Sequence, residues 1–221
     1  MAVISHWLKQ SVWILGLVAL AGGVGSVAAQ PAEADSAIEG EAGAPATDPG
    51  SDDPTVVGPQ AVFERAQQAY NERDWVAFVD TVSPNRRDEL IGQFAVVLTN
   101  LAQQPEADTR VVDLVERHVP KDLDPTDLMM GSDDPQAELV RLARRMRDGQ
   151  GFFAEAMAVV FALEFGEEAD DVKLVELTDV VIDEPGDNAV GKVTVLTPDG
   201  PRPDVWTFEK FEDDWYLSMK N

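Results

Sequence analysis

The chain has 221 residues, with 41 Asp and Glu, 17 Lys and Arg, two His and no Cys, and its formal net charge is −24. This charge argues strongly against a nucleic-acid partner, because a phosphate backbone is bound by Lys and Arg that neutralise it. Without Cys the chain has no disulfide, thiolate nucleophile or Cys-ligated metal site. The length fits one domain with extensions, and a hydrophobic fraction of 44 % can supply its core.

The first residues predict export. Residues 1–29 combine a basic start at Lys9, an apolar run over 12–24 and small residues at 26–29, which is the pattern of a signal peptide. Cleavage after Ala28 or Ala29 would release a periplasmic or secreted protein with no stable membrane insertion. The alternative is an uncleaved tether, because residues 12–29 carry no charge and reach the lower limit of a membrane-spanning length.

Residues 30–58 are expected to form a disordered acidic linker. They contain seven acidic residues, no basic residue and no aromatic residue, and Ala, Gly and Pro supply most of the rest. Such a composition buries too little apolar surface to offset the entropy of ordering. We interpret the linker as a solubilising tail, with a spacer that holds the domain away from a membrane or wall as the alternative.

The single domain is expected at 59–221, and its first part has helical periodicity. Pro59, Asp74, Ser83 with Pro84, and Asp108 are placed to begin four successive helices. An acidic loop is expected over 120–135, then a helix over 136–148. A Gly-rich break at 149–151 precedes a helix over 152–165, which is apolar on nearly every side.

Near residue 172 the period changes from 3.6 to 2. Strands are expected over 174–182, 189–197, 205–211 and 215–219, joined by short turns that favour an antiparallel meander. Helices followed by such strands predict an α+β fold, with N-terminal helices packed on a C-terminal four-stranded antiparallel sheet.

Two stretches resemble the nuclear transport factor 2-like superfamily. One is the helix from Ala61 that ends in the break Asn71–Trp75 and leads through a short helix to Ser83. The other is the closing hairpin Phe208–Leu217, with an acidic turn and a Trp-led strand. The resemblance implies a cone-shaped sheet, as in ketosteroid isomerases and many exported bacterial domains. The chain departs from the family in its extra helices over 84–165, which could fill or cover the mouth of the cone.

Several residues are candidates for a site, each with a structural alternative. If the cone encloses a ligand pocket, we expect Tyr70, Phe94, Glu155 and Trp206 to line it. Glu155 would be a buried proton acceptor there, although it also suits the first turn of a helix. His118 is the one His left after signal removal. Its place near a helix end suits a favourable interaction with the helix dipole, which is a simpler interpretation than a role in a catalytic relay.

Charged clusters give two further candidates. Arg141, Arg144 and Arg145 form a basic ridge, with Arg147 nearby, that could bind an acidic partner but more simply pairs with the chain's own carboxylates. The stretch 122–133 has oxygen ligands at the spacing of an EF-hand calcium loop. However, Asp127 stands where that loop requires Gly, and Asp133 stands where it has a bidentate Glu. We therefore predict no metal site and no cofactor.

The leading interpretation is an exported, non-catalytic binding or interaction domain for an unknown small molecule or envelope protein. The alternative is a small-molecule isomerase or dehydratase that uses acid–base residues in an apolar cavity. A hollow interior with one or two polar groups would favour the enzyme, and a packed interior would disfavour it. The oligomeric state is left open.

Overall fold

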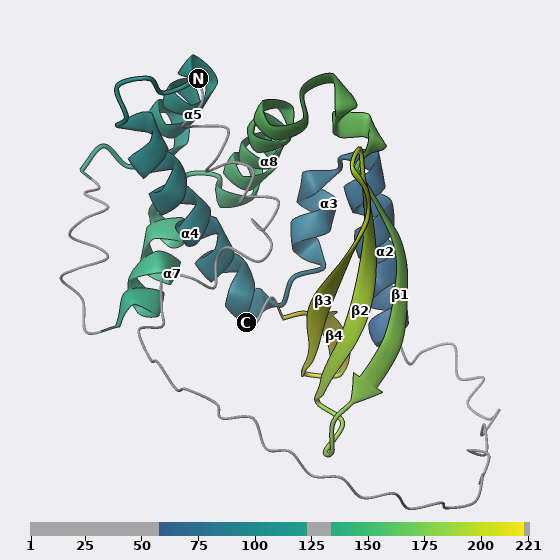
Figure 1. Ribbon diagram of the computed structural model, residues 1–221. Helices are drawn as coiled ribbons and strands as arrows, with labels where there is room; N and C mark the ends of the chain where they lie inside the picture. The colour runs from purple at the N-terminus through teal and green to yellow at the C-terminus, as the bar shows by residue number, and fades with distance from the viewer. Residues whose placement is uncertain (1–57, 123–133, 219–221) are drawn as a thin grey trace, which may run out of the picture.

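The structure is a computed structural model that describes residues 58–122 and 134–218. It confirms an α+β fold in which helices precede a four-stranded antiparallel sheet (Figure 1). The predicted signal peptide, nearly all of the linker and most of the calcium-like loop lie outside the described residues. The elements are α2 (Pro59–Glu72), α3 (Trp75–Asp80), α4 (Pro84–Ala102), α5 (Thr109–His118), α7 (Pro135–Arg145), α8 (Gly149–Phe165), the 3₁₀ helix η3 (Gly166–Asp171), β1 (Lys173–Ile182), β2 (Asn188–Thr197), β3 (Gly200–Phe211) and β4 (Asp214–Leu217).

The helix boundaries follow from local chemistry. Pro59 occupies the first turn of α2, where its missing N–H has no helical partner to lose. Arg73 ends α2 in the left-handed conformation, with a φ of 61°. Asp74 then caps α3 by accepting a hydrogen bond from the Ala77 N–H at 3.0 Å. The chain therefore turns sharply between α2 and α3.

The helices form two groups joined by α8. Helix α2 packs against β1 and β4, whereas α4 packs against α5 and α7. Helix α8 contacts α3, α4 and α5 and lies between the groups (Figure 1). Only Ala158 and Ala162 of α8 are exposed, as its nearly uniform apolar sequence predicts. The buried apolar side chains of all these elements form one continuous core.

The strands pair in the order β1-β2-β3-β4, each antiparallel to the next. Residues 81–83 run beside β4: the Ser83 N–H donates to the Leu217 carbonyl at 2.9 Å, and the Leu217 N–H donates to the Thr81 carbonyl at 2.8 Å. Val82 and Leu217 thereby form a parallel bridge. The segment before α4 is thus tied to the last strand.

The structure corrects the predicted start of α8. Gly149–Gly151 belong to the first turn of the helix, because Asp148 caps it by accepting a hydrogen bond from the Gly151 N–H at 2.8 Å. Helix α7 accordingly ends at Arg145, before the position predicted for it. Two Gly residues this close together predict a break, but the Asp before them caps the helix and decides the local structure.

The third strand is longer than predicted and begins at Gly200. The sequence predicts this strand only from residue 205, but Pro201 and Pro203 already pair with Leu196 and Thr194 of β2. Strand β4 covers only residues 208–211 of β3. On the side away from β2, the part of β3 before residue 208 therefore has no neighbouring strand among the described elements. A residue without an N–H is tolerated at such an edge.

Candidate functional site

Aromatic side chains occupy the space between the sheet and helices α2, α3 and α8, where a pocket was considered. The Phe63 and Trp206 rings meet edge to face at 5.9 Å, and Phe78 lies 6.4 Å from Trp206. None of the six rings in this group is more than 9 % exposed. Such contacts fill an interior and add packing energy beyond burial. The members of this aromatic core are Phe63, Tyr70, Trp75, Phe78, Phe161 and Trp206.

Arg73 closes one side of this aromatic core. Its guanidinium carbon lies 4.9 Å from the centre of the Phe161 ring and 5.4 Å from that of Tyr70. The same group donates hydrogen bonds to the carbonyls of Tyr70 at 2.9 Å and Val172 at 2.7 Å, and to that of Ala169. Arg73 therefore ties the end of α2 to the segment between α8 and β1.

Tyr70 is the titratable side chain with the strongest perturbation that the structure gives. Burial raises the pKa of Tyr70 far above its ordinary value; the charge of Arg73 opposes this shift, and Glu164 and Asp204 reinforce it. The phenol is thus held in its protonated form. Asp204 also accepts a hydrogen bond from the Trp206 indole N–H at 3.0 Å.

The Tyr70 shift predicts a loss of stability at alkaline pH. The folded chain keeps a proton that the unfolded chain releases above pH of about 10, so the stabilisation is complete below that pH and is lost as pH rises. The slope expected from this one group is about 1.4 kcal/mol per pH unit. Tyr70→Phe should remove this component from the alkaline dependence of the unfolding free energy. Equal slopes in wild type and variant would contradict the assignment.

A polar groove of about 480 Å³ lies outside the aromatic core, beside the first turns of α4 and α7. Arg86 in its wall pairs with Glu89 at 2.6 Å, and Glu209 accepts a hydrogen bond from the Ser83 hydroxyl. The groove is open to solvent, and its acids outnumber its described basic residue. It is therefore not built for an anion. Its lining residues are Asn85, Arg86, Glu89, Asp134, Gln136, Ala137, Val140 and Glu209.

Glu155 of α8 and His118 of α5 lie side by side where these two helices meet. Glu155 pairs with Arg117 at 2.7 Å and lies 3.3 Å from the His118 Nε2. The His118 ring packs against Phe152, with its centre 5.8 Å away. The Glu155 side chain is 44 % exposed. This is a solvated ion-pair cluster that joins two helices, and it lacks the dry setting that a buried proton acceptor requires.

The predicted basic ridge pairs with the chain's own carboxylates. Arg141 meets Glu138 at 2.5 Å, Arg144 meets Asp88 at 2.8 Å and Arg145 meets Asp122 at 2.7 Å. The Arg145 guanidinium lowers the pKa of Asp122 through these hydrogen bonds. Asp88 and Asp122 belong to other parts of the chain, so the ridge fastens α7 to its surroundings.

The four residues predicted to line a pocket do not share one space. Tyr70 and Trp206 both contact Phe78 in the aromatic core. Phe94 instead packs against Phe153, with ring centres 5.0 Å apart, where α4 meets α8. Glu155 lies in the α5–α8 ion-pair cluster. Only half of the proposed set therefore belongs to the space between helices and sheet.

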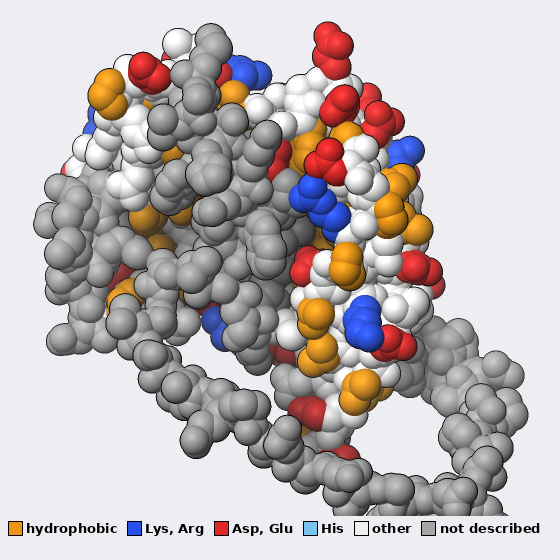
Figure 2. Space-filling view, viewed as in Figure 1, with side chains coloured by type: hydrophobic (Ala, Val, Ile, Leu, Met, Phe, Trp, Pro, Cys, Tyr) orange, Lys and Arg blue, Asp and Glu red, His pale blue; other side chains and the backbone are white. Residues whose placement is uncertain are grey.

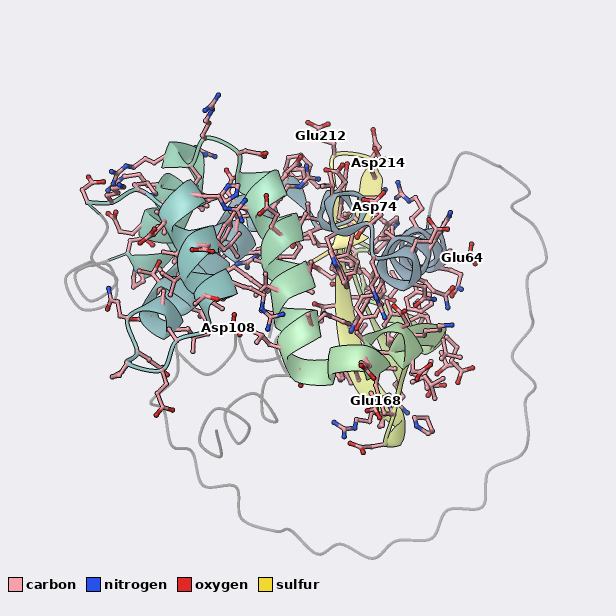
Figure 3. The ribbon with its side chains drawn as sticks, turned by 90° about the horizontal axis from the view of Figure 1, so that it is seen from above. Glu64, Asp74, Asp108, Glu168, Glu212 and Asp214 are labelled. Carbon is pink, nitrogen blue, oxygen red and sulfur yellow. The ribbon has the colours of Figure 1, made fainter. Side chains whose placement is uncertain are left out.

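Acidic side chains are spread around the molecule. In Figure 3, Glu64, Asp108 and Glu168 lie far from one another, and Asp74, Glu212 and Asp214 lie toward a further side of the view. Within residues 58–122 and 134–218, no group of three or more His, Cys, Asp or Glu is arranged to hold a metal ion. Asp122, the first predicted calcium ligand, pairs with Arg145. The rest of that calcium-like loop lies outside the described residues.

Arg73 is the important residue that sequence reasoning missed. The break after α2 was predicted, but the partners of Arg73 are about a hundred residues away in sequence. A basic residue at a helix end usually signals only a dipole contact. The only indication of a buried role in the sequence is that Arg73 lies close to the aromatic residues Tyr70 and Trp75.

Comparison with known proteins gives no relative from which a function could be transferred. No protein-family model, curated protein or solved structure matches the chain. None of the described helices combines the length and apolar character needed to cross a membrane.

Proposed function

We propose that this chain is an exported, non-catalytic binding or interaction domain of the nuclear transport factor 2-like kind. The observation that carries the proposal is the aromatic core: bulky rings occupy the space between the sheet and helices α2, α3 and α8, where the sequence predicts a pocket if the domain is hollow. An apolar cavity with a few convergent polar groups is the usual setting of small-molecule chemistry. Because the interior is filled, we expect ligands or partners to bind at the surface of the domain.

The charged groups support the same conclusion. Glu155 contacts both Arg117 and His118, and Arg86 pairs with Glu89 in the groove. The Arg117–Glu155 pair joins α5 to α8, whereas Arg86 and Glu89 both belong to α4; in each pair the charge is already met by a neighbour within the chain. Arg73 is committed to three backbone carbonyls of its own chain.

The kinship proposal rests on the two resembling stretches. The first forms α2, the break and α3, and the second forms the β3–β4 hairpin. The Val82–Leu217 bridge puts the end of the first beside the end of the second. This proximity supports one domain built from both, and the apolar run in residues 1–29 supports its export.

The experiment that tests the function is a thermal-shift measurement with small apolar ligands such as indole, naphthol and a sterol. We expect no change in the Tm of the wild type, because the aromatic core leaves no room for them. Phe63→Ala is the control, since it removes a buried ring beside Trp206 and opens a cavity that such ligands can fill. A saturable rise in the wild-type Tm would favour the isomerase or dehydratase alternative.

A further inference from the structure

The free edges of the sheet are protected in most places. Residues 81–83 cover the edge of β4 through two backbone hydrogen bonds with Leu217. The part of β3 that β4 does not cover carries Pro201 and Pro203, which have no N–H to offer. Short covered edges and edge prolines are the usual means of preventing unwanted strand pairing.

The first half of β1 is closed by two amide side chains of α2. The Asn71 side-chain amide donates to the Leu174 carbonyl at 3.0 Å, and its oxygen accepts from the Leu174 N–H at 2.9 Å. Gln67 donates to the carbonyls of Leu174 at 3.1 Å and Val175 at 2.5 Å. These amides use the backbone groups that a neighbouring strand would otherwise bind.

The second half of β1 has no amide side chain of this kind bonded to its backbone among the described residues. A bulge at Asp179, with a φ of 52°, separates it from the first half. Beyond it Val180, Val181 and Ile182 are 37 %, 68 % and 51 % exposed. Seven of the nine large apolar residues that are exposed in the described part lie on β1, β2 and β3. Hydrophobic side chains are visible over the strands in Figure 2.

The backbone of this open segment points outward at Ile182. The Asp183 N–H donates to the Asn188 carbonyl of β2 at 2.9 Å. Because successive residues of an antiparallel strand alternate in direction, the Ile182 N–H points away from β2 toward solvent. No described residue hydrogen-bonds to this edge.

An acidic turn follows the open edge directly. It contains Asp183, Glu184 and Asp187 and no basic residue. Hydrogen bonds from Asn188 lower the pKa of Asp183, which keeps this carboxylate charged. A second copy of the chain would bring the same turn and the same negative charge, so charge complementarity favours a basic partner.

We propose that residues 180–182 of β1 bind an extended segment of a partner protein by strand addition, and that this segment has apolar side chains next to Lys or Arg. The backbone of Ile182 would supply hydrogen bonds, and the exposed side chains of Val180, Val181 and Ile182 would supply apolar contacts on both faces. In antiparallel pairing the basic residues precede the apolar ones and meet the acidic turn. This inference rests on the proposed binding function and names the surface that carries it.

The test uses a labelled synthetic peptide with a lysine pair ahead of alternating valines and threonines, measured by fluorescence anisotropy against the full chain. Ile182→Pro removes the outward N–H without breaking a bond to β2, and should weaken binding by about tenfold or more. Ile182→Val keeps the N–H and should bind as the wild type does. Asp183→Asn with Glu184→Gln keeps the whole edge and should weaken binding mainly at low salt. A peptide with glutamates in place of the lysines should bind far more weakly.

Hydrogen exchange of the Ile182 amide distinguishes the occupants of the edge. We expect fast exchange in the free chain at every protein concentration, and protection when the lysine peptide is added. Protection that grows with protein concentration would assign the edge to a second copy, and protection in the free monomer would assign it to another part of the same chain. Either result, or peptide binding unaffected by Ile182→Pro in a folded variant, overturns the proposal. Failure here with an unchanged wild-type Tm in the apolar-ligand test would remove the edge site but leave the binding-domain proposal intact.

Discussion

Replacing Arg73 with Ala is expected to lower the free energy of unfolding by about 3 to 4 kcal/mol. The substitution deprives the carbonyls of Tyr70, Ala169 and Val172 of a charged donor. It also removes the cation that lies against the Phe161 ring at 4.9 Å. Chemical denaturation monitored by tryptophan fluorescence measures the change.

Two further variants separate the contacts of Arg73 from its backbone conformation. Arg73→Gly loses the same contacts but relieves the left-handed φ of 61°, so it should be about 1 kcal/mol more stable than Arg73→Ala. Arg73→Lys keeps the charge but cannot reach several carbonyls with one planar group, so it should fall between Ala and wild type. If all three variants unfolded like the wild type, Arg73 would be a surface residue with no structural role.

Replacing Gly92 with Ala is expected to destabilise the protein by about 2 kcal/mol, although alanine is the better helix former. A Cβ at this position would lie 2.2 Å from the carbonyl oxygen of Leu139 and 2.7 Å from its carbon. Those atoms are backbone, so α7 would have to move away from α4. The thermal or denaturant midpoint of the variant measures this cost.

Val97→Ala is the matched control for Gly92→Ala. Val97 lies on the same helix and is 46 % exposed, so its replacement should change stability by no more than about 0.5 kcal/mol. A Gly92→Ala protein as stable as this control would mean that α4 and α7 do not approach as closely as described.

The sequence was sufficient for the order and type of the elements because local patterns decide them. Alternation in β1 and β2, with short polar turns, predicted strands that the structure has within one residue of the expected ends. Asp74 and Asp108 each cap the helix that they were expected to cap. Caps and periodicity act over a few residues, so they are visible without tertiary structure.

The features that sequence reasoning missed depend on contacts between distant residues. The predicted third strand begins only at residue 205, because only the pairing of β4 shows that Pro201 and Pro203 lie on an edge of β3, where proline is tolerated. Glycine is a poor helix former, and only the facing Leu139 carbonyl explains Gly92 in the middle of α4. Pairing of Arg144 with one of the chain's own carboxylates was expected, but its partner Asp88 lies 56 residues away in sequence and was not identifiable. Periodicity identifies a buried face but does not identify what it meets.

The candidate site shows the same division. Tyr70 and Trp206 were expected inside the domain and are buried there, because aromatic residues on inward faces rarely lie elsewhere. Phe94 and Glu155 were expected in the same space, but Phe94 packs against Phe153 of α8, and Glu155 pairs with Arg117 of α5 with its side chain half-buried. The arrangement of the helices around α8 decides where Phe94 and Glu155 lie, and hydrophobic periodicity does not predict that arrangement.

The most direct measurement of the filled interior is diffraction from crystals held under xenon, which enters apolar cavities. In the wild type we expect no xenon between α2 and the sheet, and in Phe63→Ala we expect an atom in the space left beside Trp206. A xenon atom among Phe63, Phe78 and Trp206 of the wild type would contradict the central claim, because it would show the enclosed cavity that small-molecule chemistry requires.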